Sequence, residues 1–321
     1  MISKLDQLRK VSVVVADTVD VASIERFSPT DCTTNPSLVL SAVGLPAYRE
    51  MIDQAVRWGK SCNGTKEEIV KAIADRIRVL LIAELAKALP GRVSTEVDAD
   101  LSFDVARTVD SGISIIASCE ELGIAREKVL IKIAATWEGI MAAKILEQKG
   151  INTNLTLVFS LAQAKACAEA GVFVISPFVG RIGDWYEKRG DKHSCGAAED
   201  PGAKFVREVF GYYKAVGAKT EVMAASLRST DQVEALAGCD RLTISPGLLE
   251  QMASDMGDLT KSLDISLGTV SHVSQDMQES EFRLAMNQDA MATEKLAEGI
   301  RLFLEALRNL RYLVDADLTS R

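Results

Sequence analysis

Short runs of apolar and β-branched residues recur along this 321-residue chain, and segments with helical periodicity separate them. Runs of this length and composition are typical of buried strands. Eight can be distinguished, at residues 12–17, 31–36, 93–98, 129–136, 153–159, 172–179, 221–226 and 241–245. Plausible helices lie between them, including residues 66–89, 104–122, 137–149, 161–170 and 203–216. Strands that alternate with helices pair in parallel through right-handed crossovers, so the pattern predicts an α/β fold.

The number of strand–helix units favours a closed (β/α)8 TIM barrel. Eight units in roughly 250 residues fit a barrel better than an open sheet. An open doubly wound sheet is the alternative, but neither a G-x-G-x-x-G nor a G-x-x-x-x-G-K-[ST] motif follows any of the runs. We expect residues 1–321 to form a single barrel domain, with a long loop at 180–202. A C-terminal helical extension at 281–316 contains an amphipathic helix, residues 292–313, that we expect over the barrel mouth.

Charge and cysteine usage exclude several classes of partner. The net charge is −8 and no basic run occurs, so we expect neither nucleic acid nor a membrane as partner. The six cysteines are scattered without a C-x-x-C pair, which argues against structural zinc and favours a reducing compartment, the cytoplasm. The two histidines, His193 and His272, lie in polar stretches without a neighbouring ligand. We therefore expect no metal site.

Polar residues gather where the predicted strands end, the place where barrel enzymes carry out chemistry. Asp98 and Asp100 are interpreted as turn or capping residues. The candidate site residues are Asp17, Asn35, Glu96, Asn154, Thr156, Ser176, Phe178, Arg181, Ser226 and Arg228. Period-two spacing puts the residues of each strand on one face, so these groups converge if that face is the lumen.

Lys132 is the most informative single residue, because it lies within the apolar segment VLIKIA. Burial disfavours the ammonium form of a lysine, and the free amine can attack a carbonyl. Simpler interpretations stay open: Lys132 could lie on an edge strand, and Asp17 or Glu96 could be turn formers. Arg181 and Arg228 could be surface charges, or they could clamp a phosphate through charge-assisted hydrogen bonds.

Longer motifs carry a resemblance that covers nearly the whole chain. The segments are VVADTVD, DCTTNPSL, STEVDA, VLIKIAATWEGI, NTNLTLVFSLAQA, SPFVGRI, MAASLRS, LTISPGLL and NQDAMATEKLAEGIRLF. In order and spacing they closely resemble the transaldolase family, in its classical bacterial form rather than the shorter fructose-6-phosphate aldolase-like form.

The resemblance implies a cofactor-independent Schiff-base mechanism. Lys132 would attack the C2 carbonyl of fructose 6-phosphate or sedoheptulose 7-phosphate, Glu96 would shuttle protons through a water held with Thr156, and Asp17 would deprotonate the C4 hydroxyl. Glyceraldehyde 3-phosphate or erythrose 4-phosphate would accept the three-carbon unit.

The resemblance also assigns the remaining residues and a setting. Asn35, Asn154 and Ser176 would hold hydroxyls of the fragment, and Phe178 would line the pocket. Arg181, Ser226 and Arg228 would bind the phosphate. It further implies a homodimer in the pentose phosphate pathway of carbohydrate metabolism.

Three alternatives stay open from the sequence. The first is an aldolase that releases free dihydroxyacetone, and the second is a non-catalytic barrel that binds sugar phosphates. The third is an isomerase barrel that depends on flavin or phosphate.

Overall fold

Eight parallel strands close into a barrel in the computed structural model, which describes residues 2–190, 199–264 and 277–320. Each strand pairs with the next along the chain, and β8 pairs with β1. The strands are β1 Val13–Asp17, β2 Asp31–Thr33, β3 Val93–Glu96, β4 Val129–Ala134, β5 Thr153–Val158, β6 Val174–Pro177, β7 Glu221–Ala224 and β8 Arg241–Ile244. The predicted (β/α)8 barrel is confirmed, and the open sheet is excluded.

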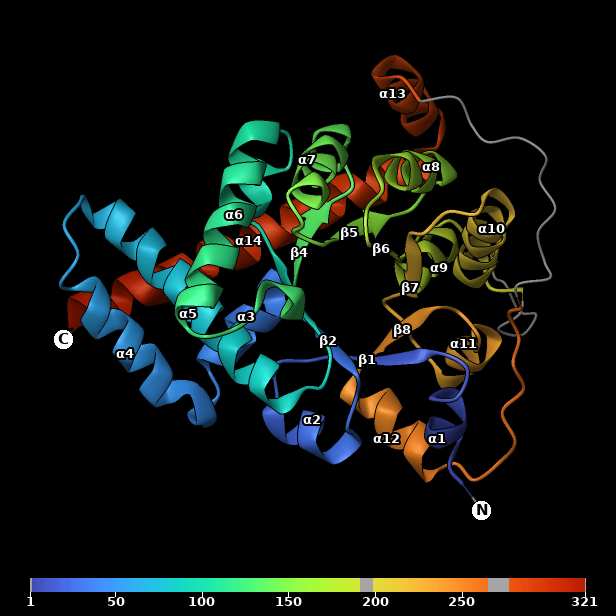
Figure 1. Cartoon of the computed structure of the whole chain (residues 1–321), viewed down its shortest axis with the longest axis horizontal. Coiled ribbons are helices and arrows are strands. Elements are labelled where there is room, and N and C mark those ends of the chain that lie inside the picture. The colour runs from blue at the N-terminus through green and yellow to red at the C-terminus, as the bar shows by residue number, and fades with distance from the viewer. Residues whose placement is uncertain (1, 191–198, 265–276, 321) are drawn as a thin grey trace.

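Helices surround the strands, as Figure 1 shows. Those in the first half are α1 Lys4–Leu8, α2 Val21–Phe27, α3 Pro36–Val43, α4 Arg49–Gly59, α5 Lys66–Ala88 and α6 Val105–Glu121, with the short 3-10 turns η1 Pro46–Tyr48, η2 Ala99–Leu101 and η3 Arg126–Lys128. The later ones are α7 Trp137–Gln148, α8 Leu161–Ala170, α9 Val179–Lys188, α10 Pro201–Val216, α11 Thr230–Ala235, α12 Pro246–Ser254, α13 Glu279–Gln288 and α14 Ala290–Ser320.

Two segments predicted from the sequence have different bounds in the structure. The second strand ends at Thr33 rather than at residue 36, because Asn35 caps α3 and Pro36 occupies the first position of that helix. The stretch 180–202 is not a continuous loop, because α9 begins at Val179 and α10 begins at Pro201. Residues 191–198 lie outside the described residues.

The lumen of the barrel consists of an apolar layer below a polar layer. Val15, Leu130, Val174 and Met223 form a buried cluster of their own inside the barrel. Side chains two residues apart on a strand share a face, so the next inward position lies one layer nearer the carboxyl end. On β4 this step leads from Leu130 to Lys132, which therefore faces the lumen.

The same step on neighbouring strands brings further polar groups into the upper layer. On β1 it leads from Val15 to Asp17, and on β6 it leads from Val174 to Ser176. The apolar layer closes the barrel beneath these groups, and they face the open carboxyl end.

The C-terminal helix α14 crosses the carboxyl end of the barrel, and Figure 1 shows it as a long red helix spanning the molecule. It contacts β5 and α9 on one side, and α3, α5 and η2 on the other. A Cβ at Gly299 would lie 2.6 Å from Leu157 Cδ2, so the helix lies close against β5 at this glycine and a side chain there would have to shift Leu157. The predicted C-terminal helix is confirmed, and it is longer than residues 292–313.

Candidate active site

A cavity of about 280 Å³ opens at the carboxyl end of the strands. Its floor is the polar layer of the lumen, and one wall comes from α14. The cavity is lined by Asp17, Thr33, Asn35, Lys132, Ser176, Phe178, Arg181, Ala225, Ser226, Leu227, Arg228, Thr243, Ser245 and Phe303. Most of the residues predicted from the sequence therefore meet in one place.

Lys132 reaches the cavity floor from the middle of β4 and is only 4% exposed. Its Nζ donates a hydrogen bond to the Thr34 carbonyl oxygen at 3.2 Å and lies 3.7 Å from Glu96 Oε2. The parallel register puts Glu96 of β3 directly beside Lys132. A primary amine with a carboxyl group at this distance can form an imine, because proton transfer has a donor and an acceptor in place.

Glu96 is 6% exposed and lies beside the main cavity, on the wall of a smaller cavity of about 20 Å³. Burial raises the pKa of Glu96 to about 7, although the positive charges of Lys132 and Arg181 act in the opposite direction. Its Oε2 accepts no hydrogen bond from the described residues. Glu96 can therefore hold or release a proton near neutral pH, as a proton shuttle must.

Asp17 lies at the end of β1 and lines the cavity, two strands away from Glu96 of β3 in the strand order. Burial raises the pKa of this carboxyl group, and the charge of Lys132 and a hydrogen bond from Thr33 partly offset the rise. Thr33 Oγ1 donates to Asp17 Oδ1 at 3.1 Å and lies 2.7 Å from Thr243 Oγ1. This threonine pair fixes the orientation of the carboxyl group.

A side-chain hydrogen-bond chain crosses the lumen next to Lys132. Ser176 Oγ donates to Asn154 Oδ1 at 2.7 Å, and Asn154 Nδ2 donates to Ser94 Oγ at 3.1 Å. Asn154 does not line the main cavity, but it stands beside Lys132 in the strand register. Thr156 is also outside the cavity lining, and its buried Oγ1 has no hydrogen-bond partner among the described residues.

Arg181 on α9 and Arg228 after β7 bring two positive charges to the rim of the cavity. Arg228 packs against Gly180, where a Cβ would lie 2.7 Å from Arg228 Cγ and 2.3 Å from the Ser226 carbonyl oxygen. Ser226 has a φ of 59°, in the left-handed region, which turns the chain sharply after β7. Two guanidinium groups beside a hydroxyl form a suitable anion site.

Sequence reasoning missed several residues that line the cavity: Thr33, Thr243, Ser245 and Phe303. Thr33 and Thr243 follow the period-two rule on β2 and β8, which could have identified them. Phe303 could not be found in this way, because the position of α14 over the mouth is a tertiary property. Asn35 lines the cavity, but its side chain also caps α3 by accepting from the Leu38 amide at 3.0 Å.

Asp98 precedes the turn η2 as expected, and its backbone carbonyl accepts from the Leu101 amide, but the expected capping by its side chain was wrong. Asp98 is 4% exposed and forms ion pairs with Arg78 on α5 and with Arg311 on α14. It makes no capping hydrogen bond to η2. Burial alone would raise the pKa of Asp98, but the surrounding positive charges, Arg78 first, outweigh burial and lower it. The carboxylate is thus held charged between the barrel and the C-terminal helix.

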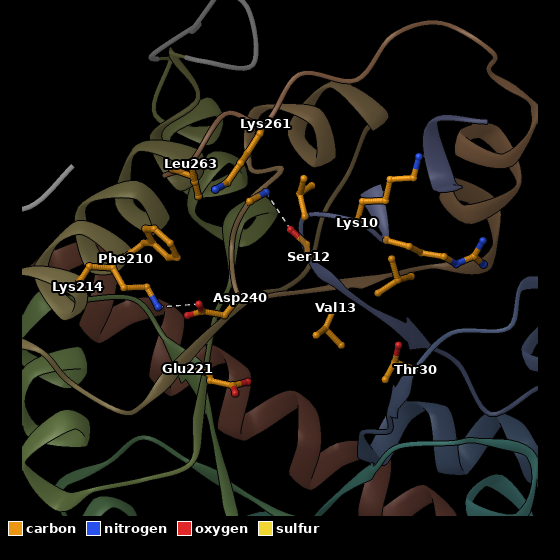
Figure 2. A pocket seen from close by; sticks show the side chains of 14 residues that line it. Lys10, Ser12, Val13, Thr30, Phe210, Lys214, Glu221, Asp240, Lys261 and Leu263 are labelled. Atoms are coloured by element: carbon orange, nitrogen blue, oxygen red, sulfur yellow. Dashed lines mark hydrogen bonds and ion pairs between the residues drawn. The ribbon is translucent and has the colours of Figure 1, made fainter. Parts of the chain in front are cut away.

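A larger cavity, about 480 Å³, lies at the opposite end of the barrel, where β1, β7 and β8 begin. Figure 2 shows Lys214 directed at Asp240, with 2.7 Å between Nζ and Oδ1. Ser12 accepts a hydrogen bond from the Gly238 amide in the same region. Because barrels place their chemistry at the carboxyl end, we assign the active site to the smaller cavity.

Metal-binding side chains do not gather anywhere in the described ranges, which leave out His193 and His272. In those same ranges, no helix is both long and apolar enough to cross a membrane.

Comparisons with known proteins agree on one family. The sequence profile of the family described as Transaldolase/Fructose-6-phosphate aldolase matches residues 14–314. A transaldolase of Agrobacterium fabrum is 53% identical over 100% of this chain and 99% of its own length. A transaldolase of Rhizobium etli is 54% identical over 99% of this chain and 98% of its own length. A transaldolase of Alteromonas mediterranea is 52% identical over 94% of this chain and 95% of its own length. A solved flavocytochrome b2 with sulfite bound has a TM-score of 0.37 and 11% identity over 91% of this chain and 65% of that chain, too low to bear on fold or function.

Proposed function

Because this chain belongs to the transaldolase family, we propose that it transfers a dihydroxyacetone unit from a ketose phosphate to an aldose phosphate through a Schiff base on Lys132. The donor is sedoheptulose 7-phosphate or fructose 6-phosphate, and the acceptor is glyceraldehyde 3-phosphate or erythrose 4-phosphate. The observation that carries the proposal is the buried Lys132–Glu96 pair, 3.7 Å apart, beside a cavity with two arginines at its rim.

Imine formation requires one group that both accepts and donates protons. Protonated Glu96 gives its proton to the C2 carbonyl oxygen as the Lys132 amine adds, and the resulting carboxylate then accepts the proton that the nitrogen loses. Protonated Glu96 then returns a proton to the departing C2 hydroxyl, which leaves as water. A carboxyl group whose pKa is about 7 serves both steps, because both of its forms are populated near neutral pH. The buried, unpartnered Thr156 hydroxyl is a suitable group to hold an intervening water.

Bond cleavage requires a second base. Asp17 accepts the proton of the C4 hydroxyl, the C3–C4 bond breaks, and its electron pair passes to the iminium nitrogen of Lys132. The aldose phosphate leaves, while an enamine remains on Lys132. The nitrogen itself accepts the electrons, so this step is complete without a metal. Attack of the enamine on an acceptor aldehyde reverses the sequence.

The rim and the floor of the cavity supply the binding groups in this proposal. Arg181, Ser226 and Arg228 bind the phosphate, and Asn35, Asn154 and Ser176 hold the hydroxyls of the three-carbon fragment. Phe178 forms part of the wall. The lining of the cavity supports these roles for all of them except Asn154, which acts through its hydrogen bond to Ser176.

Borohydride trapping tests the proposal directly. The protein is mixed with fructose 6-phosphate, reduced, and analysed by mass spectrometry of the intact chain and of its peptides. A dihydroxyacetone-sized adduct on Lys132 is expected, and Lys132→Met is the control. Binding of the sugar phosphate without an adduct on any lysine would contradict the Schiff-base mechanism and favour a binding role. Product analysis with and without acceptor separates a transferase from an aldolase that releases dihydroxyacetone.

The setting of the enzyme forms part of the same proposal. We place it in the non-oxidative pentose phosphate pathway, as a homodimer in the cytoplasm, with residues 1–321 as one domain. The described cysteines, Cys32, Cys62, Cys119, Cys167 and Cys239, are all free thiols, which suits a reducing compartment. Sedimentation of the purified protein tests the dimer.

A further inference from the structure

The C-terminal helix contributes to the anion site at the rim of the cavity. Phe303 on α14 lines the cavity and is 2% exposed. The guanidinium carbon of Arg181 lies 5.6 Å from the centre of the Phe303 ring and 4.9 Å from the centre of the Phe178 ring. Both distances fall within the range of cation–π attraction.

Within the described residues, no hydrogen bond or ion pair fixes the orientation of Arg181. Its Nη1 is buried without a hydrogen-bond partner, and no carboxylate within the described residues forms an ion pair with it. Glu298, the acidic group on the adjoining stretch of α14, is ion-paired with Lys295. The aromatic contacts therefore orient Arg181 while its N–H groups stay available to a ligand.

A single turn of α14 forms this wall. Gly299 and Phe303 are four residues apart and share a helix face. A Cβ at Gly299 would lie 3.2 Å from Arg181 Nη1 and 2.6 Å from Leu157 Cδ2, so this turn of the helix lies directly against both side chains. The close approach at Gly299 brings the Phe303 ring against Arg181.

We propose that Phe303 is a positioning residue that orients the Arg181 guanidinium for the phosphate of the substrate, so that α14 sets the preference for phosphorylated sugars. The inference rests on the proposed function for the identity of the substrate. It reaches further, because it makes the C-terminal helix part of the phosphate site rather than only a cover.

Inorganic phosphate is a probe that does not depend on turnover. Calorimetric titration should show phosphate binding about three- to tenfold more weakly to Phe303→Leu, because the cation–π contact is lost while an apolar side chain remains. Phe303→Trp, which keeps an aromatic face, should retain binding within about twofold. The matched control is Phe282→Leu, since Phe282 is 3% exposed on α13 and packs on Trp137 instead.

Two further measurements separate positioning from general packing. The KM for fructose 6-phosphate should rise in Phe303→Leu, and the ratio of kcat/KM for fructose 6-phosphate to kcat/KM for unphosphorylated fructose should fall, whereas Phe282→Leu should alter neither. In an Arg181→Met background, Phe303→Leu should weaken phosphate binding by less than about twofold, since the two residues act as one unit. An equal loss in Phe282→Leu, or an undiminished effect without Arg181, would overturn the inference. Failure of borohydride trapping alongside normal phosphate binding would contradict the proposed function only.

Discussion

Asp98, just beyond β3, and Arg311, on the C-terminal helix, form an ion pair with 2.7 Å between Oδ2 and Nη2. Arg78 of α5 holds the other oxygen of the same carboxylate. The pair therefore connects α14 to the barrel on the side away from Arg181, only two residues along the chain from Glu96. Together with the contact at Gly299, it fastens the helix at both sides of the mouth.

Removal of the Asp98–Arg311 ion pair should let α14 move away from the cavity that holds the enamine. We predict that Arg311→Met raises the ratio of released to transferred dihydroxyacetone about three- to tenfold, because water enters more readily when the helix moves away. Lys66→Met is the matched control, since Lys66 also joins α5 to α14, but through an exposed pair with Asp315. Product analysis by chromatography measures the ratio. An unchanged ratio in Arg311→Met, or an equal rise in Lys66→Met, would contradict the prediction.

The amine of Lys132 is the proposed nucleophile, so replacing Lys132 should remove nearly all activity. Lys132→Met should reduce turnover by at least about 10³-fold and abolish borohydride trapping, because methionine keeps the stem and lacks the amine. The protein should still bind inorganic phosphate, since Arg181 and Arg228 are untouched. Residual trapping at another lysine would show that the nucleophile lies elsewhere.

The pKa of Glu96 gives the imine-forming step a pH dependence of defined sign. Burial raises the pKa to about 7, so Glu96 is mainly protonated below that pH and mainly ionised above it. Loss of water from the carbinolamine needs the protonated form, and the rate of trapping should fall as pH rises through about 7. Rapid-quench trapping across this range measures it. In Glu96→Gln, trapping should be slow and its rate should no longer fall as pH rises through about 7. If the fall persists in this variant, another group causes it.

Gly180 permits Arg228 to reach the rim of the cavity. We predict that Gly180→Ala raises the KM for fructose 6-phosphate by about tenfold or more, because a methyl group there would collide with Arg228 and with the Ser226 carbonyl. Steady-state kinetics measured separately with fructose 6-phosphate and with unphosphorylated fructose test this prediction. Gly247→Ala is a control without close neighbours at the new methyl group, and equal effects on both sugars would point to misfolding instead.

The buried ion pair between Arg78 and Asp98 should matter for stability. Arg78→Met is expected to lower the free energy of unfolding by about 3 kcal/mol or more, because the buried Asp98 carboxylate loses one of the positive charges that neutralise it. Arg57→Met, which removes an exposed pair with Glu50, should change the free energy of unfolding far less, because water already solvates both charges. Urea unfolding measures both, and similar values for the two variants would contradict the expectation.

The barrel could be predicted from the sequence because its signals are local. Apolar runs such as VLIKIA have the length and composition of buried strands, and an acidic residue or lysine inside one stands out. The bounds were less predictable. Asn35 ends its strand early because a capping residue followed by proline starts a helix, and α9 was missed because its polar composition resembles that of a loop.

Lys132, Glu96 and Asp17 were candidates from local pattern alone, because the rarity of charge in an apolar strand is visible without any long-range contact. The tertiary structure decided what those groups face and what covers them. The parallel pairing of β3 with β4 sets Glu96 beside Lys132, and the path of α14 brings Phe303 to Arg181 and Arg311 to Asp98. These last two pairings join residues more than a hundred positions apart, and no local periodicity contains that information, because it depends on how a whole helix packs across the finished barrel.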